Sequence, residues 1–223
     1  AKTGAPVCFL LDEGYLTDLR TGLAGAVAAK YLAPKETSRI GIVGTGVQAR
    51  FQLRCLSYVN DCKDVLVYGR SADKRQLYKS EMTELGFHVE ATDDLRAIAR
   101  GCDLIVTTTP SKTALLMAED IRPGTHITAM GADADGKQEL DERILQKADL
   151  VVCDSLTQCI DHGELFHAIE AGLVQGEDCL EMGQWMQSGR PRTDAMITVA
   201  DLTGIATQDI AITSLVLTCS LEA

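Results

Sequence analysis

The feature that most constrains the fold is a short apolar segment followed at once by a glycine-rich turn. Residues 40–43 are Ile-Gly-Ile-Val, and Gly44-Thr45-Gly46-Val47-Gln48-Ala49 comes directly after them. The apolar segment predicts a buried strand, and the apolar spacing beyond the glycines predicts a helix. Gly44 would permit the tight turn, Gly46 would let a pyrophosphate approach the backbone, and Ala49 would let the helix pack close to the strand. The segment therefore predicts dinucleotide binding at a helix N-terminus rather than an ordinary turn.

Further apolar segments recur along the chain and alternate with helix-like ones. We predict strands at residues 7–11, 64–68, 86–90, 103–110, 124–131 and 149–154. The alternation predicts an α/β fold, a Rossmann doubly wound parallel sheet whose ligand lies beyond the carboxyl ends of the strands. It fades past residue 163, and residues 197–209 are predicted to open a final helix that ends near Cys219.

Composition narrows the class of function. The formal net charge of −11 argues against nucleic-acid or anionic-membrane partners, and no apolar run reaches the roughly 18 residues that a membrane helix needs. The eight cysteines contain no C-x-x-C pair, so we expect buried free thiols in a reducing, cytoplasmic location and no metal site. The chain starts at Ala1 rather than Met and lacks a signal-peptide pattern, which indicates a fragment or a processed chain.

The end of the second strand bears on the type of cofactor. In an NAD-binding unit, an acidic residue about 20 residues past the glycines bonds the ribose 2′-hydroxyl. Arg70 and Ser71 stand there instead, and a guanidinium with a hydroxyl suits a 2′-phosphate. NADP(H) is therefore favoured, and NAD(H) stays possible if Arg70 is solvated and Asp73 or backbone groups serve the ribose. Thr107 and Thr108, at the end of a later strand, would lie beside the cofactor unless they only fill the strand.

Four motifs follow one another across nearly the whole chain. They are Leu16-Thr17-Asp18-Leu19-Arg20-Thr21, Gly44-Thr45-Gly46-Val47-Gln48-Ala49, Gly131-Ala132-Asp133-Ala134-Asp135-Gly136-Lys137 and Asp201-Leu202-Thr203-Gly204-Ile205-Ala206-Thr207-Gln208-Asp209. Together they resemble the ornithine cyclodeaminase/μ-crystallin family. The resemblance implies a nicotinamide-dependent enzyme: an ornithine cyclodeaminase, an alanine dehydrogenase of the archaeal kind, or a reductase of ketimines or cyclic imino acids.

The resemblance also implies a division into domains. Residues 1–20 would belong to a substrate and dimerisation domain, 21–180 to the Rossmann domain, and 181–223 to a segment that returns to the first domain. The protein would then be a homodimer. Family members carry a longer segment before the position where this chain starts, so we expect that part of the substrate domain to be missing or compressed here.

Roles for single residues come from the same resemblance. Asp133 matches a general acid/base that faces the reacting amine and carbon, where the alternative is a turn cap. Arg20 matches the arginine that pairs with the substrate α-carboxylate, where the alternative is a surface charge. Thr203 and Gly204 match the segment that closes over substrate and cofactor. The cofactor-binding residues that we expect are Thr21, Gly44, Gly46, Val47, Gln48, Arg70, Ser71, Thr107, Thr108, Met130, Gly131 and Lys137, the last of which could also be a solvated charge.

The expected reaction is hydride transfer at the α-carbon of a small amino acid or its imine. Attack of a side-chain amine on the iminium would give cyclisation with loss of ammonia, water would give a keto acid, and the reverse direction would reduce an imine. The alternative is a non-catalytic protein that binds NADP(H) and a small ligand, as in μ-crystallin.

Overall fold

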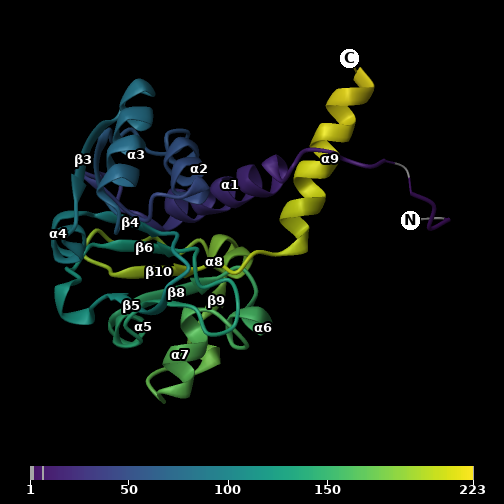
Figure 1. Ribbon diagram of the computed structural model, residues 1–223. Coiled ribbons are helices and arrows are strands. Elements are labelled where there is room, and N and C mark those ends of the chain that lie inside the picture. Colours follow the sequence, from purple (N-terminus) through teal and green to yellow (C-terminus); the bar gives the residue numbers. More distant parts are fainter. Residues whose placement is uncertain (1–2, 7, 223) are drawn as a thin grey trace.

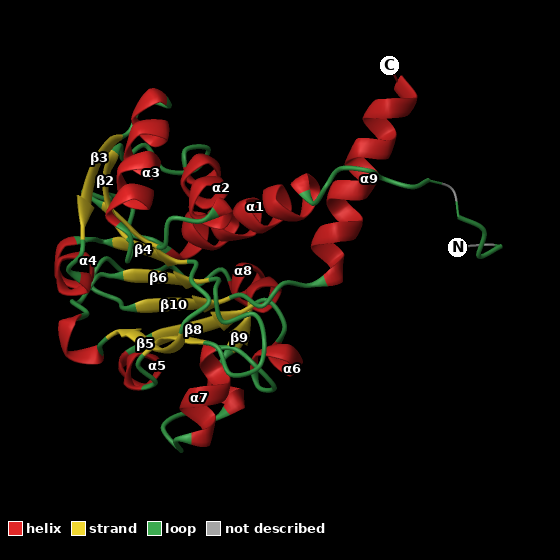
Figure 2. Ribbon diagram, in the orientation of Figure 1, coloured by secondary structure: helices red, strands yellow, loops and turns green. Residues whose placement is uncertain are grey.

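A single parallel sheet forms the centre of the computed structural model, which describes residues 3–6 and 8–222 (Figure 2). Its eight strands lie in the order β3-β2-β1-β4-β6-β10-β8-β9, and all neighbouring pairs are parallel. The strands are β1 (Ile40–Val43), β2 (Asp64–Tyr68), β3 (His88–Thr92), β4 (Leu104–Thr107), β6 (His126–Ala129), β8 (Leu150–Cys153), β9 (Leu180–Glu181) and β10 (Thr198–Asp201). The predicted Rossmann sheet is confirmed.

Successive side chains of a strand point to opposite faces of the sheet, and the central strands are buried at every position. Both faces are therefore buried, and helices cover both of them. Ile42 packs in one core with α1 (Tyr15–Leu32), α2 (Val47–Leu56), α3 (Ala72–Glu84) and α8 (Met182–Ser188). Val43 packs in the other core with α4 (Leu95–Gly101), α5 (Arg143–Lys147) and α7 (Glu164–Glu170). The remaining helical elements are η1 (Ala118–Asp120), α6 (Leu156–Cys159), η2 (Gly176–Asp178) and α9 (Ala206–Glu222).

Helix α9 extends away from the sheet, and among the described elements α1 is its main contact with the body of the molecule (Figure 1). It leaves Ile210 65% and Leu215 61% exposed. Among the helices of the described residues, none is long and apolar enough to cross a membrane. All eight cysteines are free. Five are buried as predicted, namely Cys55, Cys102, Cys153, Cys159 and Cys179, whereas Cys62 is half-buried and Cys8 and Cys219 are exposed, contrary to the prediction.

The end of the chain differs from the prediction. Residues 197–209 were predicted to open a helix, but Thr198–Asp201 forms β10, and α9 begins only at Ala206. All four residues of β10 are buried between β6 and β8. In a strand that is buried on both faces, apolar and polar residues do not alternate, so the sequence pattern alone does not distinguish such a strand from a buried helix. Residues 181–223 therefore supply a central strand of the sheet in addition to α9. The division into two domains stays a prediction.

Two further strand predictions need correction. Residues 8–11 form no strand, and Val7 lies outside the described residues. A second sheet was missed: β5 (Lys112–Leu116) pairs in parallel with β7 (Gln138–Leu140). The polar sequence around β7 predicted a loop, yet Glu139 is fully buried because its carboxylate binds backbone N–H groups.

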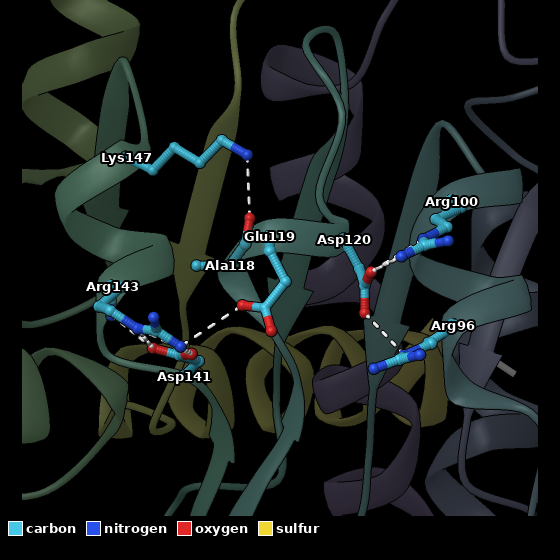
Figure 3. Close-up of polar contacts among 8 residues, drawn as sticks. All are labelled: Arg96, Arg100, Ala118, Glu119, Asp120, Asp141, Arg143 and Lys147. Carbon is cyan, nitrogen blue, oxygen red and sulfur yellow. Dashed lines mark hydrogen bonds and ion pairs between the residues drawn. The ribbon is translucent and has the colours of Figure 1, made fainter.

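A polar network joins η1 to α4 and α5 (Figure 3). Asp120 is 3% exposed, and its Oδ1 accepts a hydrogen bond from Arg100 Nε at 2.8 Å. Its Oδ2 lies 3.5 Å from Arg96 Nε. Lys147 donates to the carbonyls of Ala118 and Ile121 at 2.9 and 2.7 Å. Arg100 and Lys147 lie in the last turns of helices that lead into β4 and β8, so the network lies toward the amino ends of the strands.

We expect Asp120→Asn to destabilise the fold, because the amide keeps the volume but loses the charge that two arginines bind. The free energy of unfolding should fall by about 1–3 kcal/mol in urea denaturation. The neighbouring Glu119 is 59% exposed, so Glu119→Gln should change it by less than about 0.5 kcal/mol. Equal effects of the two substitutions would contradict a stabilising role for the buried pair.

Candidate active site

The glycine turn lies where the order of the strands reverses. β1 pairs with β2 on one side and with β4 on the other. Gly44 has φ 123°, and a Cβ at this position would lie 2.6 Å from Thr108 Oγ1. Thr108 itself donates its N–H to Val43 O at 2.9 Å. Only glycine therefore fits at position 44, and the crevice beyond it is the place where doubly wound sheets bind nucleotides.

Helix α2 begins with free backbone donors. Gly46 is its N-cap, no side chain caps it, and nothing lies within 4 Å of a Cβ built on Gly46. Val47 is 55% exposed. The first N–H groups of a ten-residue helix thus face open space, so the turn fits the pyrophosphate of a dinucleotide.

Two predicted cofactor residues lie where α1 contacts α2. Gln48 Nε2 donates to Asp18 Oδ1 at 2.8 Å, so this side chain is turned toward α1. Thr21 O accepts a bond from Gln52 Nε2 at 2.9 Å, which places Thr21 beside the glycine-turn helix. The cofactor roles of both residues stay predictions. Because the Gln48 side chain is bonded to Asp18, its predicted contact with a phosphate would be made by its backbone N–H.

The exit of β2 presents an unengaged cation. Arg70 is exposed, and within residues 3–6 and 8–222 it makes no hydrogen bond or ion pair. The Ser71 hydroxyl instead caps α3, because it accepts a bond from Lys74 N at 3.4 Å. The Arg70 side chain is therefore free of protein partners in the described part of the chain, and its cofactor role stays a prediction.

Strands β4 and β6 end side by side. Met130 N donates to Thr107 O at 3.0 Å, and both residues are buried. Beyond them, Gly131 begins the loop that carries Asp133 and Lys137. The Asp133 side chain is 50% exposed and forms an ion pair with Lys137. The structure thus brings these two predicted residues together at the carboxyl edge of the sheet, with a carboxylate open to solvent.

Arg20 lies against the loop that follows β10. Its Nε is 3.0 Å from Asp209 Oδ1, and its Nη1 donates to Gln208 Oε1 at 3.1 Å. Gly204 has φ 88°, and a Cβ there would lie 3.0 Å from Arg20 Nη1. The structure thus brings together Arg20 and Gly204, both of which were predicted to bind substrate. The Arg20 side chain is 17% exposed, and its substrate-binding role stays a prediction.

Asp154 holds this loop, and the sequence analysis did not single it out. Its carboxylate accepts bonds from Gly204 N at 2.7 Å and from Thr203 N and Oγ1 at 3.3 Å each. Its position could have identified it, because Asp154 ends a predicted strand and ligands of such sheets bind beyond the carboxyl ends of the strands.

A pocket of about 420 Å³ opens beside Arg20, between α1 and α9. Its polar side chains are Arg20, Asp154 and Gln208, and its apolar walls come largely from α1, α9 and Leu202. A cation at the edge of apolar walls suits a small molecule that has a carboxylate and an apolar portion.

Three buried carboxyl groups lie behind the site loops. Glu139 and Glu164 each accept two backbone N–H bonds, and Asp201 accepts one from Leu165 N at 2.9 Å. Burial raises the pKa of Glu139, and burial together with the charge of Asp201 raises the pKa of Glu164. Burial raises the pKa of Asp201 to about 7. Backbone amides therefore bind these groups without fully offsetting the cost of charging them.

The parallel sheet and the uncapped helix behind a glycine turn define the class of Rossmann dinucleotide-binding proteins. The chain belongs to the ornithine cyclodeaminase/mu-crystallin family, whose model matches residues 1–222. It is 44% identical over 220 residues to an uncharacterized cyclodeaminase of Sinorhizobium fredii. The match covers 96% of this chain and 66% of that relative. The chain thus spans somewhat less than two thirds of the length of this relative.

Two solved structures share the fold closely. An archaeal alanine dehydrogenase dimer with bound NAD superposes with a TM-score of 0.93 at 39% identity, over 99% of this chain and 69% of that one. A Δ(1)-pyrroline-2-carboxylate reductase of Thermococcus litoralis, in complex with NADH and L-proline, gives a TM-score of 0.93 at 28% identity, with the same coverage of 99% and 69%. The predicted family and fold are confirmed.

The raised pKa of Asp201 gives a testable dependence of stability on pH. Between about pH 4 and pH 7 the folded protein keeps a proton on Asp201 that the unfolded chain has lost, so stability falls as pH rises through this window. Asp201→Asn stays neutral and can still accept the Leu165 bond. Urea denaturation from pH 4.5 to 7.5 should show a fall in unfolding free energy that is smaller by at least about 1 kcal/mol in the variant.

Asp61→Asn is the matched control, because this side chain is exposed and its substitution should leave the profile unchanged. An identical pH profile for wild type and Asp201→Asn would show that Asp201 is already ionised in the folded protein.

Proposed function

We propose that this chain belongs to an enzyme that transfers hydride between a nicotinamide cofactor and the α-carbon of a small amino acid or its imine. The observation that carries the proposal is the meeting of two things at one edge of the sheet. There the turn at Gly44 and Gly46 fits a dinucleotide, and the loops after β6 and β10 bring Asp133 and the Arg20–Gly204 contact to the same edge. The relatives named as a dehydrogenase with NAD and a reductase with NADH and L-proline support this reaction class.

In this proposal Arg20 binds the substrate α-carboxylate, and its bonds to Gln208 and Asp209 fix the direction of the guanidinium. Asp133 moves a proton at the substrate nitrogen, where its solvent-facing carboxylate can exchange that proton with water. Thr203 and Gly204, held by Asp154, close the site beside Arg20. The bound nicotinamide supplies the hydride chemistry, and the protein supplies orientation and charge.

Imine reduction and amino-acid dehydrogenation are the two directions of this reaction, and cyclodeamination shares its iminium. We favour a reductase or dehydrogenase of a small α-amino acid, because the pocket beside Arg20 has apolar walls. The protein would act as a homodimer in the cytoplasm. The exposed apolar residues Ile210 and Leu215 of α9, and the dimeric state of the archaeal relative, support the homodimer.

We also propose that NADP(H) is preferred over NAD(H). The support is Arg70 at the exit of β2, an exposed guanidinium without an ion-pair partner in the described part of the chain, since a guanidinium suits a 2′-phosphate. The related structures contain NAD or NADH, so NAD(H) is the competing cofactor for this site.

The reaction is tested by following reduced-nicotinamide absorbance for the full-length protein with alanine, ornithine and a cyclic imino acid, each with both cofactors. A net absorbance change with alanine or the cyclic imino acid supports the proposal. Ammonia release from ornithine without an absorbance change would show a cyclodeaminase instead. Cofactor binding without any turnover would show a binding protein and overturn the enzymatic assignment.

Asp133→Asn should lower kcat by about 100-fold or more, because an amide cannot exchange the proton. The affinity for the reduced cofactor, measured by its fluorescence, should stay within about 3-fold of wild type, since the change is under 1 kcal/mol. Asp135→Asn, in the same exposed loop, is the control and should leave both values unchanged. A fully active Asp133→Asn would remove Asp133 from the reaction.

Arg70→Ala should weaken NADPH binding by about 10-fold or more while changing NADH binding little, because only the 2′-phosphate loses a charge-assisted contact. Lys79→Ala, a cation in the second half of α3, serves as the control for net charge. Fluorescence titrations of both cofactors decide the matter, and equal losses for NADPH and NADH would contradict the preference.

A further inference from the structure

One buried side chain connects the two strand exits that lead into the candidate site. The Glu139 side chain is fully buried, and its Oε1 accepts a bond from Thr109 N at 2.5 Å while its Oε2 accepts one from Gly131 N at 2.9 Å. Thr109 follows β4, and Gly131 follows β6, which are neighbours in the sheet. A single carboxylate thus links the two loops, in addition to the backbone hydrogen bonds that pair their strands.

The bridge is closely fitted. A Cβ on Gly131 would lie 2.5 Å from Glu139 Oε2 and 2.3 Å from Thr109 O, so no side chain fits between the carboxylate and the backbone of residue 131. Gly131 is also the first residue of the loop that carries Asp133. The Glu139 carboxylate therefore contacts the residue at which this loop leaves the sheet.

Glu139 is itself held from the opposite side. Its backbone N–H donates to Glu164 Oε1 at 2.7 Å, and Leu140 N donates to Glu164 Oε2 at 3.1 Å. Glu164 starts α7, whose next residue, Leu165, donates its N–H to Asp201 Oδ2 at 2.9 Å. Because β7 is anchored to α7 and α7 to the end of β10, the Glu139 carboxylate has a rigid base.

We infer that Glu139 is a positioning residue of the candidate site, which clamps the exits of β4 and β6 and thereby fixes the loop of Asp133 relative to the cofactor crevice. The kinetic part of this inference rests on the proposed hydride transfer. A displacement of about 1 Å in a reacting group can cost on the order of 100-fold in rate, so a clamp of this kind has a measurable effect without touching the substrate.

Glu139→Gln tests the clamp at constant volume, because its amide NH₂ faces one of the two backbone N–H groups and cannot accept from it. We expect kcat to fall by about 10-fold to 100-fold, while the affinity for the reduced cofactor changes by less than about 3-fold. Glu139→Asp keeps the charge but is one methylene shorter, so it should not restore kcat. Full activity in Glu139→Gln would overturn the inference, and if that variant does not fold, full activity in Glu139→Asp would overturn it.

Asp120→Asn is the matched control, since Asp120 is also a buried carboxylate but lies toward the amino ends of the strands. It should lower thermal stability and leave kcat within about 3-fold of wild type. An equal loss of kcat in Asp120→Asn and Glu139→Gln would show that activity follows stability alone, and would overturn the positioning role.

Amide hydrogen exchange of the full chain provides a readout that is independent of turnover. In Glu139→Gln, exchange of the Gly131 or Thr109 amide should accelerate by about 10-fold or more, while the Ile42 amide in the centre of the sheet should keep its rate. Unchanged exchange at both loop amides would overturn the clamp. If the wild-type protein shows no turnover, the proposed function fails and the exchange result still decides whether Glu139 fixes the loops.

Discussion

Parallel pairing of all eight strands is the constraint on which the site depends. Since every strand runs in the same direction, the exits of β1, β2, β4, β6, β8 and β10 lie at one edge. Residues separated by more than 150 positions, such as Arg20 and Gly204, meet there because α1 and the exit of β10 converge on that edge. The short apolar strands thus carry no chemistry themselves, but they determine which loops can share a ligand.

Carboxylates hold the loops at this edge. Asp154 binds the backbone of residues 203–204, and Glu139 binds Thr109 and Gly131. A buried carboxylate is costly to charge, and several backbone N–H bonds to one group offset much of that cost. The same bonds give these loops a defined conformation that short polar segments lack on their own. The cost of charging these buried carboxylates and the defined conformation of the loops therefore arise from the same hydrogen bonds.

The sequence predicted those parts of the fold that rest on local patterns. The apolar strands β1, β2, β4, β6 and β8 and the glycine turn follow from residues adjacent in the chain. β10 and β7 could not be predicted in this way, because β10 is recognised only by its partners and β7 is polar with Glu139 bonded to distant backbone. For the same reason Asp133, in a motif, was singled out, whereas Asp154 and Glu139 were not. The roles of the individual site residues stay predictions.

The position of β10 also has a consequence for how the chain folds. Among the described strands of the sheet it comes last along the chain, yet it pairs with both β6 and β8 in the interior of the sheet. Until residues 198–201 leave the ribosome, those two strands present unpaired edges and cannot be joined. The middle of the sheet is thus closed only after the other described strands have been synthesised, through contacts between residues far apart in sequence. Such late, non-local closure slows folding and leaves the edges of β6 and β8 open to edge-to-edge association until β10 pairs with them.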